Sequence, residues 1–213
     1  MEEKNQIAEI LKSAKNIAII PSRIAGTEAF IAGVGLYHLL KNAEKTVSLI
    51  YPGKVPDDFV DTISSDEITS EPGKRELIVA IDYSQTPASK VHYSTKDDIL
   101  RLSISPVNKD FDFSNITTFL QGFDFDVVIT IGAQALDDLG QTYRDLEDVI
   151  SSATVVNLDN TAKNTRFGTI SLVDILQDNL SMLVLNNFGQ WGLKLDHKAA
   201  KALLGGAMYR AAL

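Results

Sequence analysis

The chain has 213 residues, of which 45% are hydrophobic and 23% charged, with a formal net charge of −8 and no cysteine. Such a composition is typical of a globular protein, and it excludes thiol chemistry, disulfides and cysteine-ligated zinc. The acidic N-terminus lacks the apolar core of a signal peptide, and no apolar run reaches the roughly 18 residues of a membrane span. We therefore expect a cytoplasmic protein without membrane contact.

The charge pattern disfavours general nucleic-acid binding. Asp and Glu number 28 against 20 Lys and Arg, and the two signs are interspersed without a basic run. An acidic surface repels a phosphate backbone unless basic residues are concentrated locally. A small site for one phosphate or nucleotide stays compatible with this pattern.

Short apolar runs alternate with segments of helical periodicity over much of the chain. At the N-terminal end they predict a helix at 5–15, a strand at 16–21, a helix at 29–40, a strand at 46–52 and a few helical turns at 57–63. Toward the C-terminal end they predict a strand at 125–131, a helix at 137–149, strands at 154–159 and 167–174, and helices at 176–188 and 197–213. Thr27 and Asp196 are the predicted N-caps of two of these helices.

The middle of the chain has a different pattern. Residues 76–82 form an apolar run, whereas residues 90–94 and 99–105 alternate apolar and polar side chains around a turn-like segment. Such alternation is typical of an antiparallel hairpin with one solvated face.

Strand, helix and strand in succession indicate a parallel sheet with helical crossovers. The predicted fold is therefore a doubly wound, mostly parallel α/β sheet with helices on both faces, in one domain over 1–213. Residues 76–122 form an inserted strand and hairpin within it. Ligands of such sheets bind where loops leave the carboxyl ends of the strands.

The loop after Ile20 is one candidate site. Its residues Ser22, Arg23, Gly26 and Thr27 could bind an anion at a helix N-terminus. The alternative is a structural loop, in which the glycine makes a turn and the threonine caps the helix. No Walker or dinucleotide glycine pattern is present.

The loop after Leu158 is the second candidate site. Asp159 ends a strand, where a carboxylate can bind metal or accept loop N–H bonds. The loop that follows is polar and locally basic, with the candidate anion-binding residues Asn160, Thr161, Lys163 and Arg166. Asp82 also ends a strand, but one carboxylate does not make a metal site.

Four segments together resemble the DHH-family phosphoesterases, which include the RecJ and oligoribonuclease relatives. The segments are NIAIIPSRIAGTEAFIAGVGLYHLL, FDVVITIGAQALDDLG, VVNLDNTAKNTRFGTISLVD and LDHKAAKALLGGAMYRAAL. The resemblance covers nearly the whole chain apart from about 76–122. It implies an α/β domain that binds two Mn²⁺ or Mg²⁺ ions for phosphodiester cleavage.

The same resemblance implies that most metal ligands have been replaced. The family's first-motif histidine falls on Ser22, its aspartates on Gly26 and Glu28, and its second-motif aspartate on Gly132. Asp159 alone is retained from the Asp-His-His motif, and a late aspartate falls near Arg210. The residual metal candidates are therefore Glu28, Asp159 and Asp82, and the family's C-terminal substrate domain is absent.

Three functions follow, in order of preference. The first is a non-catalytic scaffold that binds a protein partner or forms a homo-oligomer, with no cofactor. The second is metal-free binding of a phosphate or nucleotide in the former cleft. The third is residual Mn²⁺- or Mg²⁺-dependent phosphodiesterase activity.

Overall fold

The computed structural model describes residues 2–70, 76–84, 90–105, 107, 111–122 and 124–209. Its contacts divide the chain into two compact units, Met1–Lys74 with Phe123–Leu213, and Arg75–Gly122. No helix among the described residues is long and apolar enough to cross a membrane.

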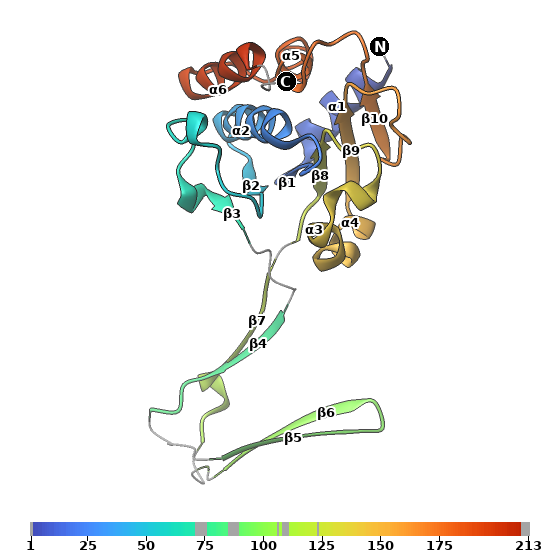
Figure 1. The fold of residues 1–213 in the computed structure, drawn as a ribbon. Helices are drawn as coiled ribbons and strands as arrows, with labels where there is room; N and C mark the ends of the chain where they lie inside the picture. Colours follow the sequence, from blue (N-terminus) through green and yellow to red (C-terminus); the bar gives the residue numbers. More distant parts are fainter. Residues whose placement is uncertain are drawn as a thin grey trace. The chain divides into compact units, whose positions relative to one another are not determined.

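The described part of the first unit contains a six-stranded parallel sheet in the order β10-β9-β8-β1-β2-β3 (Figure 1). Its strands are β1 (Asn16–Pro21), β2 (Thr46–Ile50), β3 (Ile68–Thr69), β8 (Val127–Ile131), β9 (Thr154–Asp159) and β10 (Ile170–Val173). From β1 the chain proceeds to β2 on one side, whereas β9 and β10 follow β8 on the other. The strand order therefore reverses between β1 and β8, which is where such sheets bind ligands.

Alternate side chains of the strands enter two separate cores, one on each face of the sheet. Ile17 and Ile19 of β1 pack with α1 (Glu2–Ser13), α2 (Gly26–Asn42), α5 (Leu180–Leu185) and α6 (His197–Met208). Ala18 and Ile20 pack with η4 (Leu136–Leu139), α3 (Gln141–Asp145) and α4 (Glu147–Ser152) on the opposite face. This arrangement confirms the predicted doubly wound α/β class.

Several predicted boundaries were wrong, for local reasons. The helix predicted at 137–149 is divided into η4, α3 and α4, with one break at Gly140, which takes a φ of +58°, and a second at Leu146, which takes a φ of −115°. Thr27 is not an N-cap, since α2 already begins at Gly26. The short strand β3 was not predicted. Asp196 does cap α6, where its side chain accepts the Ala199 N–H.

Two further predictions concern the ends of helices. The helix predicted at 176–188 is shorter, because Asn179 accepts the Met182 N–H and thereby begins α5 at Leu180. The last helix was predicted to continue to residue 213, but α6 ends at Met208. Arg210 and the three residues after it lie outside the described residues.

The described part of the second unit consists of two antiparallel strand pairs. β4 (Glu76–Ile81) pairs with β7 (Ile116–Gln121), and β5 (Lys90–Lys96) pairs with β6 (Ile99–Ser105). The predicted hairpin is thus present, whereas β7 was not predicted as a strand. A short helical turn, η3 (Phe113–Asn115), precedes β7.

Close helix packing in the first unit depends on small residues. A Cβ atom added to Gly206 of α6 would lie 2.1 Å from Ser181 Oγ and 2.7 Å from the Ile31 side chain. Gly205 is different, since its nearest neighbour would be the Phe59 ring at 3.4 Å. α6 therefore contacts α2 and α5 through Gly206 and not through Gly205.

We expect Gly206→Ala to lower the free energy of unfolding by about 1–3 kcal/mol, because the new methyl group overpacks the helix contact. Gly205→Ala, one residue earlier, is the matched control and should be neutral or stabilising by up to about 1 kcal/mol, since alanine favours helix. Urea unfolding of the two variants measures this difference. Equal effects of both substitutions would contradict the packing described here.

Candidate functional site

The candidate site lies at the carboxyl ends of β1, β8 and β9, beside the reversal in strand order. Ser22 follows β1, Gly132 follows β8, and Asp159 ends β9. Backbone bonds fix these strand ends, because Ser22 N–H donates to Ile131 O at 2.8 Å and Gly132 N–H donates to Leu158 O at 2.8 Å. The predicted loops after β1 and β9 thus belong to one edge of the sheet.

The Asp159 side chain is buried, with 1% of the residue exposed. Its Oδ1 accepts the Asn160 N–H at 2.9 Å, and its Oδ2 accepts from Thr161 Oγ1 at 2.6 Å and from Asn164 Nδ2 at 2.7 Å. These three donors from the described residues are neutral, and all come from the loop that follows β9. The carboxylate therefore stabilises its own loop, which agrees with the alternative that Asp159 accepts loop N–H bonds instead of binding metal.

Asn164 connects this carboxylate to a buried polar chain across the strands. Its Nδ2 also donates to Ala133 O at 2.8 Å, and its Oδ1 accepts from Asn157 Nδ2 at 3.1 Å. Asn157 in turn accepts from Thr130 Oγ1 at 3.0 Å. Thr130 and Asn157 are both fully buried. Thr130 and Asn157 are polar residues inside apolar strands. This pattern was the sequence signal for the hydrogen-bonded series, and it was not recognised.

Glu28, the second candidate metal ligand, also has a structural contact. Its Oε1 accepts the N–H of Leu180 at 2.8 Å, which joins α2 to the start of α5. A carboxylate at a helix N-terminus satisfies an otherwise free N–H group and interacts favourably with the helix dipole.

Gly132 occupies a closed space with a φ of +70°. A Cβ atom there would lie 2.7 Å from Ala25 Cβ, 2.8 Å from Leu180 Cδ1 and 3.3 Å from Ala29 Cβ. Apolar atoms therefore surround the position onto which the family's second-motif aspartate falls. A carboxylate side chain does not fit at residue 132 in this structure.

The loop after β1 contains a buried serine, the start of α2 and an exposed arginine. Ser22 is fully buried, and its Oγ accepts the Ile24 N–H at 3.2 Å. Gly26 has a φ of +58° and begins α2, and Thr27 lies in the first turn of that helix. Arg23 is exposed.

The basic residues after β9 do not converge on Asp159. Arg166 donates from Nη1 to Ser171 O at 3.2 Å, which directs the guanidinium toward β10. Lys163 is exposed, and Asn160 Nδ2 donates to Gln177 O at 3.3 Å. The structure thus brings Asn160 and Thr161 to the carboxylate but not the two cations.

Asp82 belongs to the second unit, beyond the end of β4. Its Oδ1 accepts the Ser84 N–H at 3.0 Å, and hydrogen bonds from the Ser84 backbone and side chain lower its pKa. Its carboxylate has a local turn-stabilising contact.

The donor set does not fit a two-metal centre. Among the described residues, no three His, Asp or Glu side chains gather closely enough to hold a metal ion. Two divalent cations need several anionic or imidazole ligands. The two candidate ligands at this edge, Asp159 and Glu28, each already accept N–H or O–H donors of the protein.

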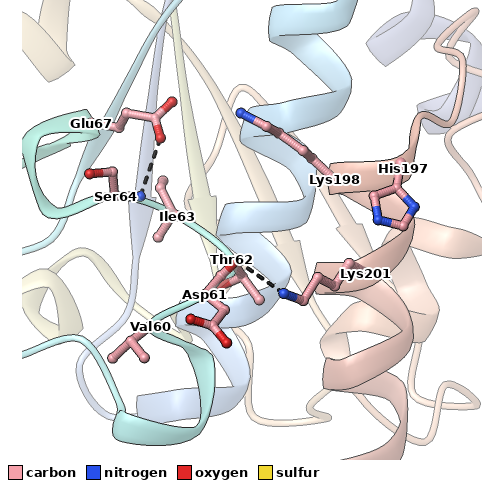
Figure 2. Close-up of a pocket in the computed structure, with 9 residues that line it drawn as sticks. All are labelled: Val60, Asp61, Thr62, Ile63, Ser64, Glu67, His197, Lys198 and Lys201. Carbon is pink, nitrogen blue, oxygen red and sulfur yellow. Dashed lines mark hydrogen bonds between the residues drawn. The ribbon is translucent and has the colours of Figure 1, made fainter.

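A separate pocket of about 420 Å³ lies between α6 and the segment that contains η1 (Asp57–Phe59) and η2 (Ser65–Glu67). Figure 2 shows the pocket's lysine side chains, Lys198 and Lys201, on α6, where Lys201 Nζ donates to Asp61 O at 3.2 Å. On the opposite wall, the Glu67 carboxylate accepts the Ser64 N–H. Behind it, His38 Nε2 lies 2.7 Å from Thr62 O. None of the residues that line this pocket was predicted from the sequence as a site residue. It is lined by Val60, Asp61, Thr62, Ile63, Ser64, Glu67, His197, Lys198 and Lys201.

The fold of the chain is similar to that of a solved structure. The chain matches an exopolyphosphatase-related protein from Bacteroides fragilis with a TM-score of 0.63 and 16% identity, over 98% of this chain and 52% of that one. The chain thus spans about half the length of that neighbour. No family model matches the sequence, and no curated protein matches it. At this identity the likeness shows the fold alone.

We expect Asn164→Ala to lower the free energy of unfolding by about 2–4 kcal/mol, because buried groups of Asp159 and Asn157 lose a partner. Lys163→Ala, at an exposed neighbouring position, is the control and should change stability by no more than about 0.5 kcal/mol. Chemical denaturation of both variants measures the effect. A loss below about 1 kcal/mol for Asn164→Ala would contradict a structural role of the Asp159 contacts.

Tyr37 gives a pH-dependent prediction. Burial, and then the nearby Glu67 and Asp66 carboxylates, raise the pKa of Tyr37 from 10.0 to about 12. Its neutral form is favoured in the folded state, so its contribution to stability is complete below pH 10 and is lost between pH 10 and about 12. The free energy of unfolding should therefore fall more steeply over this range in the natural protein than in Tyr37→Phe. Denaturant unfolding at several alkaline pH values compares the two, and parallel curves would contradict the prediction.

Proposed function

We propose that this chain is a non-catalytic protein that has a phosphoesterase-like fold and acts by binding protein rather than by metal-dependent hydrolysis. The fold similarity to an exopolyphosphatase-related protein supports the phosphoesterase-like architecture. The contacts at the strand ends support the loss of catalysis.

The buried Asp159 carboxylate is the observation that carries the proposal. Metal binding would require its Oδ2 to release Thr161 Oγ1 and Asn164 Nδ2. A hydrogen bond to a charged group is worth about 1.5–3 kcal/mol, so breaking two of them opposes an ion by several kcal/mol. An ion that gains a single carboxylate in return also lacks the ligands to offset its charge.

The contacts of Glu28 and the surroundings of Gly132 also oppose metal binding. If Glu28 turned toward a metal ion, the Leu180 N–H at the start of α5 would lose its acceptor. Apolar groups enclose Gly132 where a further ligand would have to stand. The two candidate carboxylates at this edge of the sheet thus have the interactions of structural groups.

Binding of a phosphate or nucleotide at this edge gains no support from the contacts. Thr161 donates its hydroxyl group to Asp159, and Arg166 donates to Ser171 O, so these two donors are already used within the protein. Anion binding by these residues, and residual Mn²⁺- or Mg²⁺-dependent cleavage, stay predictions from the sequence.

A protein-binding role gains support from exposed apolar side chains in the second unit. Large apolar residues of β5 and β6 are mostly exposed, notably Val91, Tyr93, Leu100 and Leu102. Contiguous apolar surface on a folded protein commonly marks an interaction site.

A hydrolysis assay with the purified chain tests the proposal. With Mn²⁺ or Mg²⁺ and a short oligoribonucleotide, polyphosphate or a simple phosphodiester, we expect no turnover above the metal-only blank. Asp159→Asn and Glu28→Gln serve as control variants, because a true metal site would lose its activity with either carboxylate. Metal-dependent turnover that is abolished in these folded variants would overturn the proposal.

A further inference from the structure

The β5–β6 hairpin has one apolar face and one polar face. The cross-strand pairs Val91–Ile104, Tyr93–Leu102 and Thr95–Leu100 lie on the first face, because directly opposed residues of an antiparallel ladder share a face. The other face carries the pairs Lys90–Ser105, His92–Ser103, Ser94–Arg101 and Lys96–Ile99. The hairpin is therefore amphipathic along its whole length.

The apolar face is open to solvent. Tyr93 is 78% exposed, Val91 66% and Leu100 62%. A two-stranded hairpin alone is at best marginally stable in water and needs further strands or a packed partner against its apolar face. Among the described residues, the β5–β6 hairpin has only these two strands, paired at seven positions, so we expect a partner to pack against its exposed apolar face.

We propose that this partner is the same hairpin of a second copy of the chain, packed face to face with the two hairpins antiparallel. The inference rests on the protein-binding role proposed above and names its partner. In this arrangement the central Tyr93–Leu102 pair meets its own copy at the two-fold axis. The Val91–Ile104 pair of each hairpin then covers the Thr95–Leu100 pair of the other.

The charges at the two ends of the hairpin favour this antiparallel pairing. The tight turn at the tip carries Asp97 and Asp98, both at positive φ, next to Lys96, so this end has a net charge of −1, whereas Lys90 stands at the open end. A strand of seven residues spans about 20 Å, so an antiparallel copy brings the acidic tip of one hairpin level with the open end of the other, where Lys90 extends from the polar face. A parallel arrangement would instead place the two acidic tips together.

The distribution of net charge also directs association to this unit. Residues 75–122 contain five basic and six acidic residues, so they hold only −1 of the chain's charge of −8. The remainder of the chain holds −7, and its copies repel one another. The second unit is thus the part of the molecule that a second copy can approach at little electrostatic cost.

Sedimentation velocity of the full chain over a range of concentrations tests the proposal. The face is small, so we expect a weak dimer with a dissociation constant on the order of 100 µM. Leu102→Lys should weaken association at least about tenfold. Ser103→Lys is the matched control, since it places the same charge one residue along β6 on the opposite face, and it should leave the dimer unchanged.

A second variant separates association from hairpin folding. Asp97→Asn with Asp98→Gly installs the most favourable residues for this turn, so the hairpin is strengthened while both tip charges are removed. We expect weaker dimerisation with this variant and a weaker salt dependence. Lys90→Glu should also weaken the dimer, and adding the two tip substitutions to it should restore part of the loss.

Several outcomes would overturn the inference. A natural chain that stays monomeric at about 500 µM would do so, as would an oligomer that responds equally to Leu102→Lys and Ser103→Lys. A monomer that Leu102→Lys destabilises would indicate that the face is covered within the same chain. None of these results bears on hydrolysis, so a failed dimer and a failed proposal of non-catalytic function are distinguishable.

Discussion

A buried carboxylate must be compensated by a cation or by hydrogen bonds, and the arrangement at the edge of this sheet depends on that requirement. Asp159 is compensated by three neutral donors from the following loop. Because Asn164 also reaches Ala133 O and Asn157, the same contacts fix the loop, the end of β8 and the middle of β9. The carboxylate thus organises the strand ends through hydrogen bonds within the protein.

The neighbouring positions have adapted to the same arrangement. Glu28 holds the start of α5, and the Leu180 side chain that follows contacts the space beside Gly132. Metal binding at this edge would require changes at several contacts together, since Asp159 and Glu28 already accept hydrogen bonds inside the protein. The phosphoesterase-like fold is therefore compatible with the proposed absence of catalysis.

Much of the fold could be predicted because buried strands are encoded by local apolar runs, as in β1 and β9. The break at Gly140, where φ is positive, was missed, and so was the two-residue β3, which depends on its pairing with β2. At the site, Asp159 was identified by its place after an apolar run. The sequence could not show that Asn164 would bind it or that Arg166 would turn toward Ser171 O, because both depend on the folded loop.

The most direct test of the account is a crystal of the protein soaked in Mn²⁺ and measured at a wavelength where manganese scatters anomalously. We predict no anomalous peak beside Asp159, with Thr161 and Asn164 still donating to its Oδ2. A manganese peak within coordination distance of Asp159, with those two side chains turned away from the carboxylate, would contradict the central claim.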